Sequence, residues 1–76
     1  MHYLLTLRPA ENVEGAHIVE YEFEMLKIDH QRAIEVSEKV SNEPFELLNG
    51  EFCQMTPLKL AFWIEDENES RLIKRW

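Results

Sequence analysis

Few side chains in this sequence are of the types that bind metals or act as nucleophiles. The histidines are His2, His17 and His30, and Cys53 is the one cysteine. No pair of histidines has the i,i+4 spacing of a helical metal site or the i,i+2 spacing of a strand site. His2 and His17 would become neighbours only if the first two strands formed a suitable hairpin. We therefore expect no catalytic residue, no metal site and no bound cofactor.

Neither Cys53 nor the glycines match a known catalytic or phosphate-binding pattern. No basic residue adjoins Cys53 to favour its thiolate, so a buried structural role is expected. The only two glycines, Gly15 and Gly50, are isolated, whereas a phosphate-binding loop needs several together. We expect a non-enzymatic protein.

The carboxylates offer a different kind of chemistry, which is the recognition of positive charge. Glu20, Glu22 and Glu24 alternate with apolar residues, so a strand would project them from one face, roughly 6–7 Å apart. General acid–base catalysis needs a carboxyl group in a water-poor site, which such a row does not provide. The row could instead bind a basic partner or imitate a phosphate backbone. The alternative interpretation is a wet face whose charges deter aggregation.

Trp63 lies on the opposite face of its strand from Leu60 and Phe62. If that face is open, Trp63 is an exposed anchor of the kind that dominates binding energy. If other apolar side chains cover the face, Trp63 belongs to a second small cluster. The predicted partner-binding residues are Glu20, Glu22, Glu24, Trp63, Glu65, Asp66, Glu67 and Glu69.

The last residues are locally basic and aromatic, with Arg71, Lys74 and Arg75 before Trp76. Such a segment can bind single-stranded nucleic acid by stacking and phosphate contacts. In an acidic protein it can equally pair with acids on adjacent strands.

The elements that position these residues follow from hydrophobic periodicity. Residues 1–8 alternate, with Tyr3, Leu5 and Leu7 on one face. Residues 18–25 alternate more strictly, with the odd-numbered members predicted to be core and the glutamates wet. Beyond Met25 the phase slips, which indicates either a β-bulge or the end of the strand.

From Asp29, a plausible N-cap, the period changes to that of a helix of about three turns that stops before Pro44. Its small-residue face, which includes Ala33 and Ser37, should dock on the sheet, with the Ser37 hydroxyl bonded to a backbone carbonyl one turn earlier. On the opposite side, Glu35 and Lys39 form an i,i+4 pair.

The second half of the chain indicates more strands. Residues 45–56 favour a hairpin around Asn49-Gly50, which as a two-residue turn would place Leu47 opposite Phe52. A helical turn over residues 44–48 is the competing interpretation. Pro57 should interrupt, residues 58–64 should form a strand, residues 66–69 a polar turn and residues 71–76 a final antiparallel strand.

These elements predict a single α+β domain over residues 1–76. Four or five antiparallel strands in the chain order ββαββ would carry one amphipathic helix on one face. The length is 76 residues, too short for a deep pocket within the monomer. No apolar run is long enough to span a bilayer, and a lone cysteine is typical of the cytoplasm, which is the expected location.

The formal net charge of −7 disfavours nucleic-acid and anionic membrane binding by the domain as a whole. We expect a protein-binding module with a protein partner, which could itself bind nucleic acid. Small size and acidic charge are shared with phage-encoded inhibitors of host defence, anti-CRISPR proteins among them, an analogy that transfers no residue. The alternatives are a nucleic-acid binder using the basic last strand, and an oligomeric enzyme or metal protein with an intersubunit site. Free sheet edges would also allow a homodimer.

Overall fold

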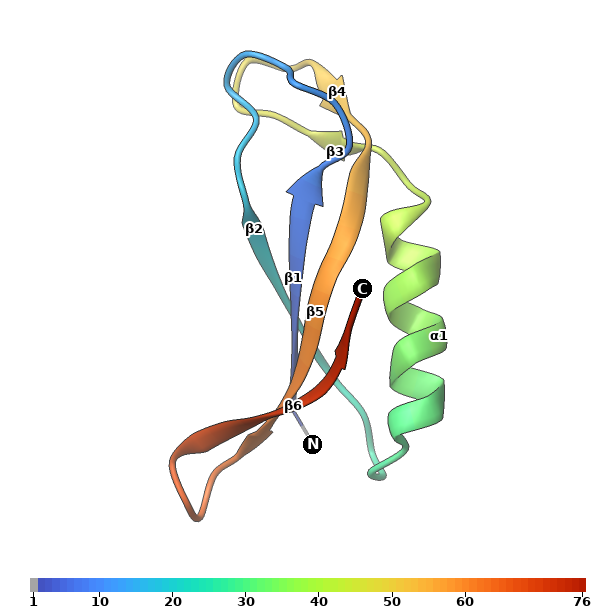
Figure 1. Ribbon diagram of the computed structural model, residues 1–76, viewed down its shortest axis with the longest axis vertical. Coiled ribbons are helices and arrows are strands. Elements are labelled where there is room, and N and C mark those ends of the chain that lie inside the picture. Colours follow the sequence, from blue (N-terminus) through green and yellow to red (C-terminus); the bar gives the residue numbers. More distant parts are fainter. Residues whose placement is uncertain (1) are drawn as a thin grey trace.

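In the computed structural model, which describes residues 2–76, one helix lies along one face of an antiparallel sheet (Figure 1). The main sheet has four strands in the spatial order β2-β1-β5-β6, and a second sheet pairs β3 with β4. The elements are β1 (His2–Pro9), β2 (Val19–Glu24), α1 (His30–Ser41), β3 (Phe45–Glu46), β4 (Phe52–Cys53), β5 (Met55–Ile64) and β6 (Glu69–Arg75). The predicted α+β class is confirmed, and the main sheet has the predicted chain order ββαββ.

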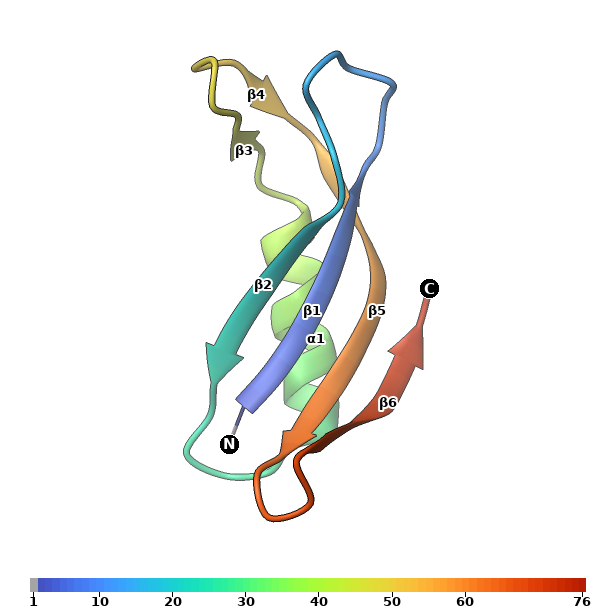
Figure 2. The same ribbon diagram turned by 90° about the vertical axis from the view of Figure 1, so that its left-hand side faces the viewer.

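The core lies between α1 and the two inner strands. Tyr3, Leu5 and Leu7 of β1 are fully buried, as their alternation predicted, and Leu60 of β5 lies directly opposite Leu5. The helix packs over β5 and β1. Figure 2 views the sheet from the side away from α1, where none of the other helices and strands described in residues 2–76 covers it.

β2 is extended, and all three of its glutamates are exposed, as the sequence predicted. Its odd-numbered residues are less hidden than expected, since Val19 and Phe23 are only half-buried and Tyr21 is 36% exposed. The reason is position: β2 is an edge strand, and α1 packs over its neighbours. The slip in phase after Met25 marks the end of the strand, which stops at Glu24.

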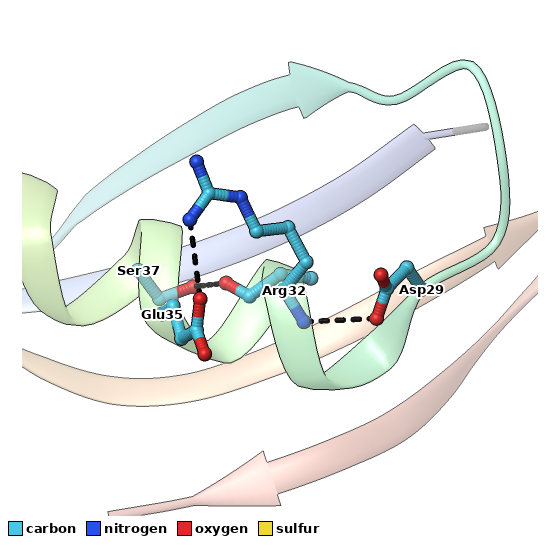
Figure 3. Close-up of polar contacts among 5 residues, drawn as sticks. Asp29, Arg32, Glu35 and Ser37 are labelled. Carbon is cyan, nitrogen blue, oxygen red and sulfur yellow. Dashed lines mark hydrogen bonds and ion pairs between the residues drawn. The ribbon is translucent and has the colours of Figure 1, made fainter.

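The first turn of α1 has the capping that the sequence predicted (Figure 3). The Asp29 carboxylate accepts a hydrogen bond of 3.0 Å from the backbone N–H of Arg32. Ser37 is buried and its hydroxyl donates to the Ala33 carbonyl at 2.8 Å, also as predicted. The exposed ion pair of this helix differs from the expectation, because Glu35 contacts Arg32 at 3.1 Å, one turn before it, and no contact with Lys39 is found.

Residues 45–53 form a hairpin, so the competing helical turn is wrong. The predicted register is also wrong by one residue. Glu46 lies opposite Phe52, and the backbone N–H of Leu47 donates to the Glu51 carbonyl at 2.7 Å, which leaves a three-residue loop. Gly50 has a φ of +85°, the left-handed conformation that three-residue hairpin loops require at one position.

β5 continues through Pro57, where the sequence predicted an interruption. Leu7 lies opposite Pro57 and Thr6 opposite Lys59, so Leu58 is an extra residue on β5. A bulge of this kind accommodates a residue that cannot donate to the ladder. The carbonyl of Leu58, the extra residue, accepts a hydrogen bond of 3.1 Å from the backbone N–H of Trp76. The polar turn of residues 65–68 is one residue earlier than predicted, because Glu69 already pairs with Ile64.

Candidate functional site

The face of the main sheet turned away from α1 is the candidate site, and the strand register defines its members. Residues directly opposite one another on antiparallel strands share a face. His2 lies opposite both Glu24 and Trp63, and Trp63 lies opposite Ser70. We call this surface the open face; it consists of Glu20, Glu22 and Glu24 (β2), His2, Leu4 and Thr6 (β1), Lys59, Ala61 and Trp63 (β5), and Ser70, Leu72 and Arg75 (β6).

The β2 side of the open face is acidic. Glu20, Glu22 and Glu24 follow one another along the edge strand and are exposed to water. The ring of His2 lies between two of them, with Nε2 3.6 Å from a carboxylate oxygen of Glu22 and Nδ1 3.4 Å from one of Glu24. This edge can therefore attract a positively charged surface, and His2 already contacts two of its carboxylates.

The centre of the open face is apolar. Leu4 lies opposite Ala61, which lies opposite Leu72, so the three form a row across β1, β5 and β6. Leu72 is 50% exposed, and Leu4, Ala61 and Trp63 are half-buried. Trp63 therefore belongs to a small apolar cluster, and no other element of residues 2–76 covers that cluster.

A shallow pocket of about 370 Å³ lies at the end of the open face that carries His2 and Trp63. His2, Leu4, Glu22, Trp63 and Glu65 line it, and we call it the face pocket. The structure thus brings together three of the residues predicted from sequence, Glu22, Trp63 and Glu65. The pocket combines apolar walls with two carboxylates.

The other predicted residues lie outside the face pocket. Glu20 is further along β2, opposite Thr6, and Glu24 contacts His2. Glu67 lies 3.8 Å from the guanidinium of Arg71. Glu69 lies opposite Ile64, which places it on the other face of the sheet.

Sequence reasoning missed His2 as a member of the site, and although β1 and β2 pair, they do not make His2 and His17 neighbours. The register places His2 opposite Glu24, at the far end of β2 from His17. The sequence did contain one signal: the alternation of β1 places His2 on the same face as Leu4. The strand register was needed to show that both residues lie beside Trp63.

His30, the first residue of α1, is exposed, yet its ring also contacts the sheet. Its Nδ1 is 2.9 Å from the hydroxyl of the buried Tyr3, and its ring packs edge-on against Phe62 at 5.6 Å. His30 is therefore part of the contact between α1 and the sheet. Cys53 is buried, as expected of a structural cysteine.

A basic corner lies at the end of β6 and consists of Lys59, Lys74, Arg75 and Trp76. Lys59 lies opposite Arg75, and the ammonium of Lys74 is 5.1 Å from the centroid of the Trp76 ring. Arg71 and Lys74 lie opposite Phe62 and Leu60, so they belong to the other face of the sheet. The basic residues of β6 are consequently divided between two faces.

Within residues 2–76, no group of three or more histidine, cysteine, aspartate or glutamate side chains is placed to hold a metal ion. The one helix of this part of the chain is too short and too polar to cross a bilayer. Comparison with known proteins found no match to a family model, to a curated protein or to a solved structure. The open face therefore has to be interpreted from its own chemistry.

Proposed function

We propose that this protein is a non-enzymatic protein-binding module whose open face binds a basic surface of another protein. The observation that carries the proposal is the composition of that face. An apolar centre containing Trp63 borders a row of three exposed glutamates, and no other element of the described residues covers either part.

The glutamate row would orient the partner and raise the rate of association. The chain has a formal net charge of −7, and Glu20, Glu22 and Glu24 concentrate part of it along one edge. Charge complementarity steers a partner toward the correct face and accelerates association, an effect that salt reduces.

The apolar centre supplies affinity. Leu4, Trp63 and Leu72 present apolar surface that a partner can bury, and tryptophan is the residue type most enriched among binding hot spots. An apolar centre bordered by charged residues is the usual anatomy of a protein interface.

The partner that fits this surface best is a nucleic-acid-binding protein. Such proteins present clustered lysine and arginine to a line of phosphates. Three carboxylates in a row on β2, at a spacing of roughly 6–7 Å, offer a similar line of negative charge. A protein that occupies a nucleic-acid-binding surface in this way acts as an inhibitor.

The test is affinity capture with two matched variants. Glu20, Glu22 and Glu24 are changed to lysine in one variant, and Glu11, Glu14 and Glu51 in the other. The second set is also exposed but lies outside the open face, and both variants change the net charge equally. Partners that bind the native chain and the second variant, that are lost with the first, and that dissociate in high salt support the proposal. Identical partner sets for both variants contradict it.

The alternative, direct nucleic-acid binding, draws on the basic corner formed by Lys59, Lys74, Arg75 and Trp76. The division of the basic residues between two faces and the nearby contact of Arg71 with Glu67 favour the protein-binding proposal. Gel-shift titrations with single-stranded DNA and RNA over a salt series distinguish the two, because phosphate contacts give a steep salt dependence.

A further inference from the structure

A second hollow adjoins the face pocket at the end of β5. It has a volume of about 340 Å³, and we call it the end pocket. Its apolar walls are Ile28, Phe62, Trp63 and Ile64, and its polar groups are His2, Glu65 and Asp66. His2, Trp63 and Glu65 line both pockets, so the two pockets are immediate neighbours.

The walls of the end pocket come from two layers of the fold. Ile28 precedes the N-cap of α1 and is 54% exposed, whereas Phe62 and Ile64 belong to the helix side of β5. Phe62 is fixed from behind by the rings of Tyr3, at 5.1 Å, and His30, at 5.6 Å. The apolar wall is therefore supported by the core.

The carboxylates of the end pocket lie where β5 ends. Glu65 and Asp66 are adjacent, exposed members of the turn between β5 and β6. A long basic side chain could place its methylene groups on the apolar walls and its charge beside these carboxylates. His2, the basic group among the lining residues, contacts Glu22 and Glu24 on the side of the open face.

We propose that the end pocket receives an arginine side chain of the partner. The inference rests on the proposed function and names one chemical group of the partner. Arginine fits better than lysine because its guanidinium is planar, weakly hydrated and able to pair with carboxylates in two places at once. It also interacts favourably with an indole ring, which Trp63 supplies at this pocket.

The experiment is an NMR titration of the 15N-labelled full chain with Nα-acetyl-arginine amide. The neutral control is Nα-acetyl-citrulline amide, which keeps the shape and removes the charge, and the second control is Nα-acetyl-lysine amide. Replacing Trp76 by Phe identifies the indole signal of Trp63. The expected result is saturable shifts of that signal and of the amides of residues 62–66 with arginine, and none with citrulline.

The variant for this test is Glu65→Gln with Asp66→Gln, two exposed positions whose substitution keeps the turn polar. Arginine affinity should fall about fivefold, because two exposed charge pairs are lost. Equal responses to arginine and citrulline, equal affinities for arginine and lysine, or shifts spread over all exposed acids overturn the inference.

The outcome is separable from that of the proposed function. If partner capture depends on Glu20, Glu22 and Glu24 but arginine produces no local shift, the arginine inference fails and the proposed function stands. If arginine binds at the end pocket while capture is unaffected by those three changes, the arginine site stands and the proposed function fails.

Discussion

The hydroxyl of Tyr3 and Nδ1 of His30 are 2.9 Å apart, which links the first strand to the first residue of the helix. The same hydroxyl accepts a hydrogen bond of 3.2 Å from the backbone N–H of Asp29. The Tyr3 hydroxyl therefore bonds to two consecutive residues, Asp29 and His30, at the start of the helix. The start of α1 is thereby tied to the centre of the sheet by a buried side chain of β1.

The first prediction concerns this link. Tyr3→Phe keeps the ring but removes the hydroxyl that bonds to Asp29 and His30, and because both of these residues are exposed to water the free energy of unfolding should fall by about 0.5–1.5 kcal/mol. Urea denaturation measures the change. Tyr21→Phe is the matched control, because Tyr21 is 36% exposed, and its loss should be below about 0.5 kcal/mol. If Tyr3→Phe lowers the free energy of unfolding as little as Tyr21→Phe does, the link contributes no stability.

The helix cap gives the second prediction. Asp29→Ala removes the acceptor of the Arg32 N–H and should cost about 1 kcal/mol of unfolding free energy. Asp29→Asn should restore nearly all of it, because asparagine caps helices equally well. Thermal unfolding followed by circular dichroism compares the two variants. If asparagine is as damaging as alanine, the charge of Asp29 matters more than the hydrogen bond.

A third prediction addresses the close approach of α1 to the sheet. Ala33 is fully buried on the packed side of the helix, so Ala33→Leu should overfill the interface and cost about 1–3 kcal/mol. Gln31→Leu places the same side chain on the exposed side of the helix and should change stability by less than about 0.5 kcal/mol. Denaturant midpoints of the two variants provide the comparison, and an unchanged midpoint for Ala33→Leu would contradict the packing.

The fourth prediction concerns the hairpin loop between β3 and β4. Gly50 has a φ of +85° and open space where a Cβ would lie, so Gly50→Ala should lose stability through backbone strain alone, by about 1 kcal/mol. Gly50→Asn should lose less, because asparagine tolerates this conformation. Calorimetry on both variants tests the order, and a reversed order would indicate a different loop.

The fifth prediction concerns the open face. Leu72→Asp puts a charge in its apolar centre at a side chain that is already 50% exposed, so the fold should lose less than about 1.5 kcal/mol while partner capture is abolished. Leu48→Asp is the control, since Leu48 is fully exposed in the loop between β3 and β4. Capture that survives Leu72→Asp as well as it survives Leu48→Asp would place the interface elsewhere.

Local patterns predicted local structure well. The alternation of residues 18–25 predicted a strand with wet glutamates, and Asp29 and Pro44 predicted the limits of α1, because both signals depend only on neighbouring residues. The acidic residues and Trp63 could be proposed as a site for the same reason. The hairpin at Gly50 was predicted as well, but its register was not, since Asn-Gly suits both two-residue and three-residue loops.

Relationships between distant segments could not be predicted in this way. The contact of Tyr3 with His30 depends on how α1 crosses the sheet, and the placement of His2 beside Trp63 depends on the pairing of β1 with β5. The bulge at Leu58 is another example, because Pro57 alone reads as an interruption. Registers between strands far apart in sequence follow from packing of the whole chain, which no local pattern contains.

The inner position of β1 has a kinetic consequence. Its first residues pair with the end of β5, as His2 does with Trp63, so almost the entire chain separates the two sides of that ladder. Closing so long a loop costs chain entropy before the strand pairing contributes any stability. We expect folding to be slow for so short a chain and strongly cooperative, because neither β1 nor the surface built on it is complete until β5 has been added.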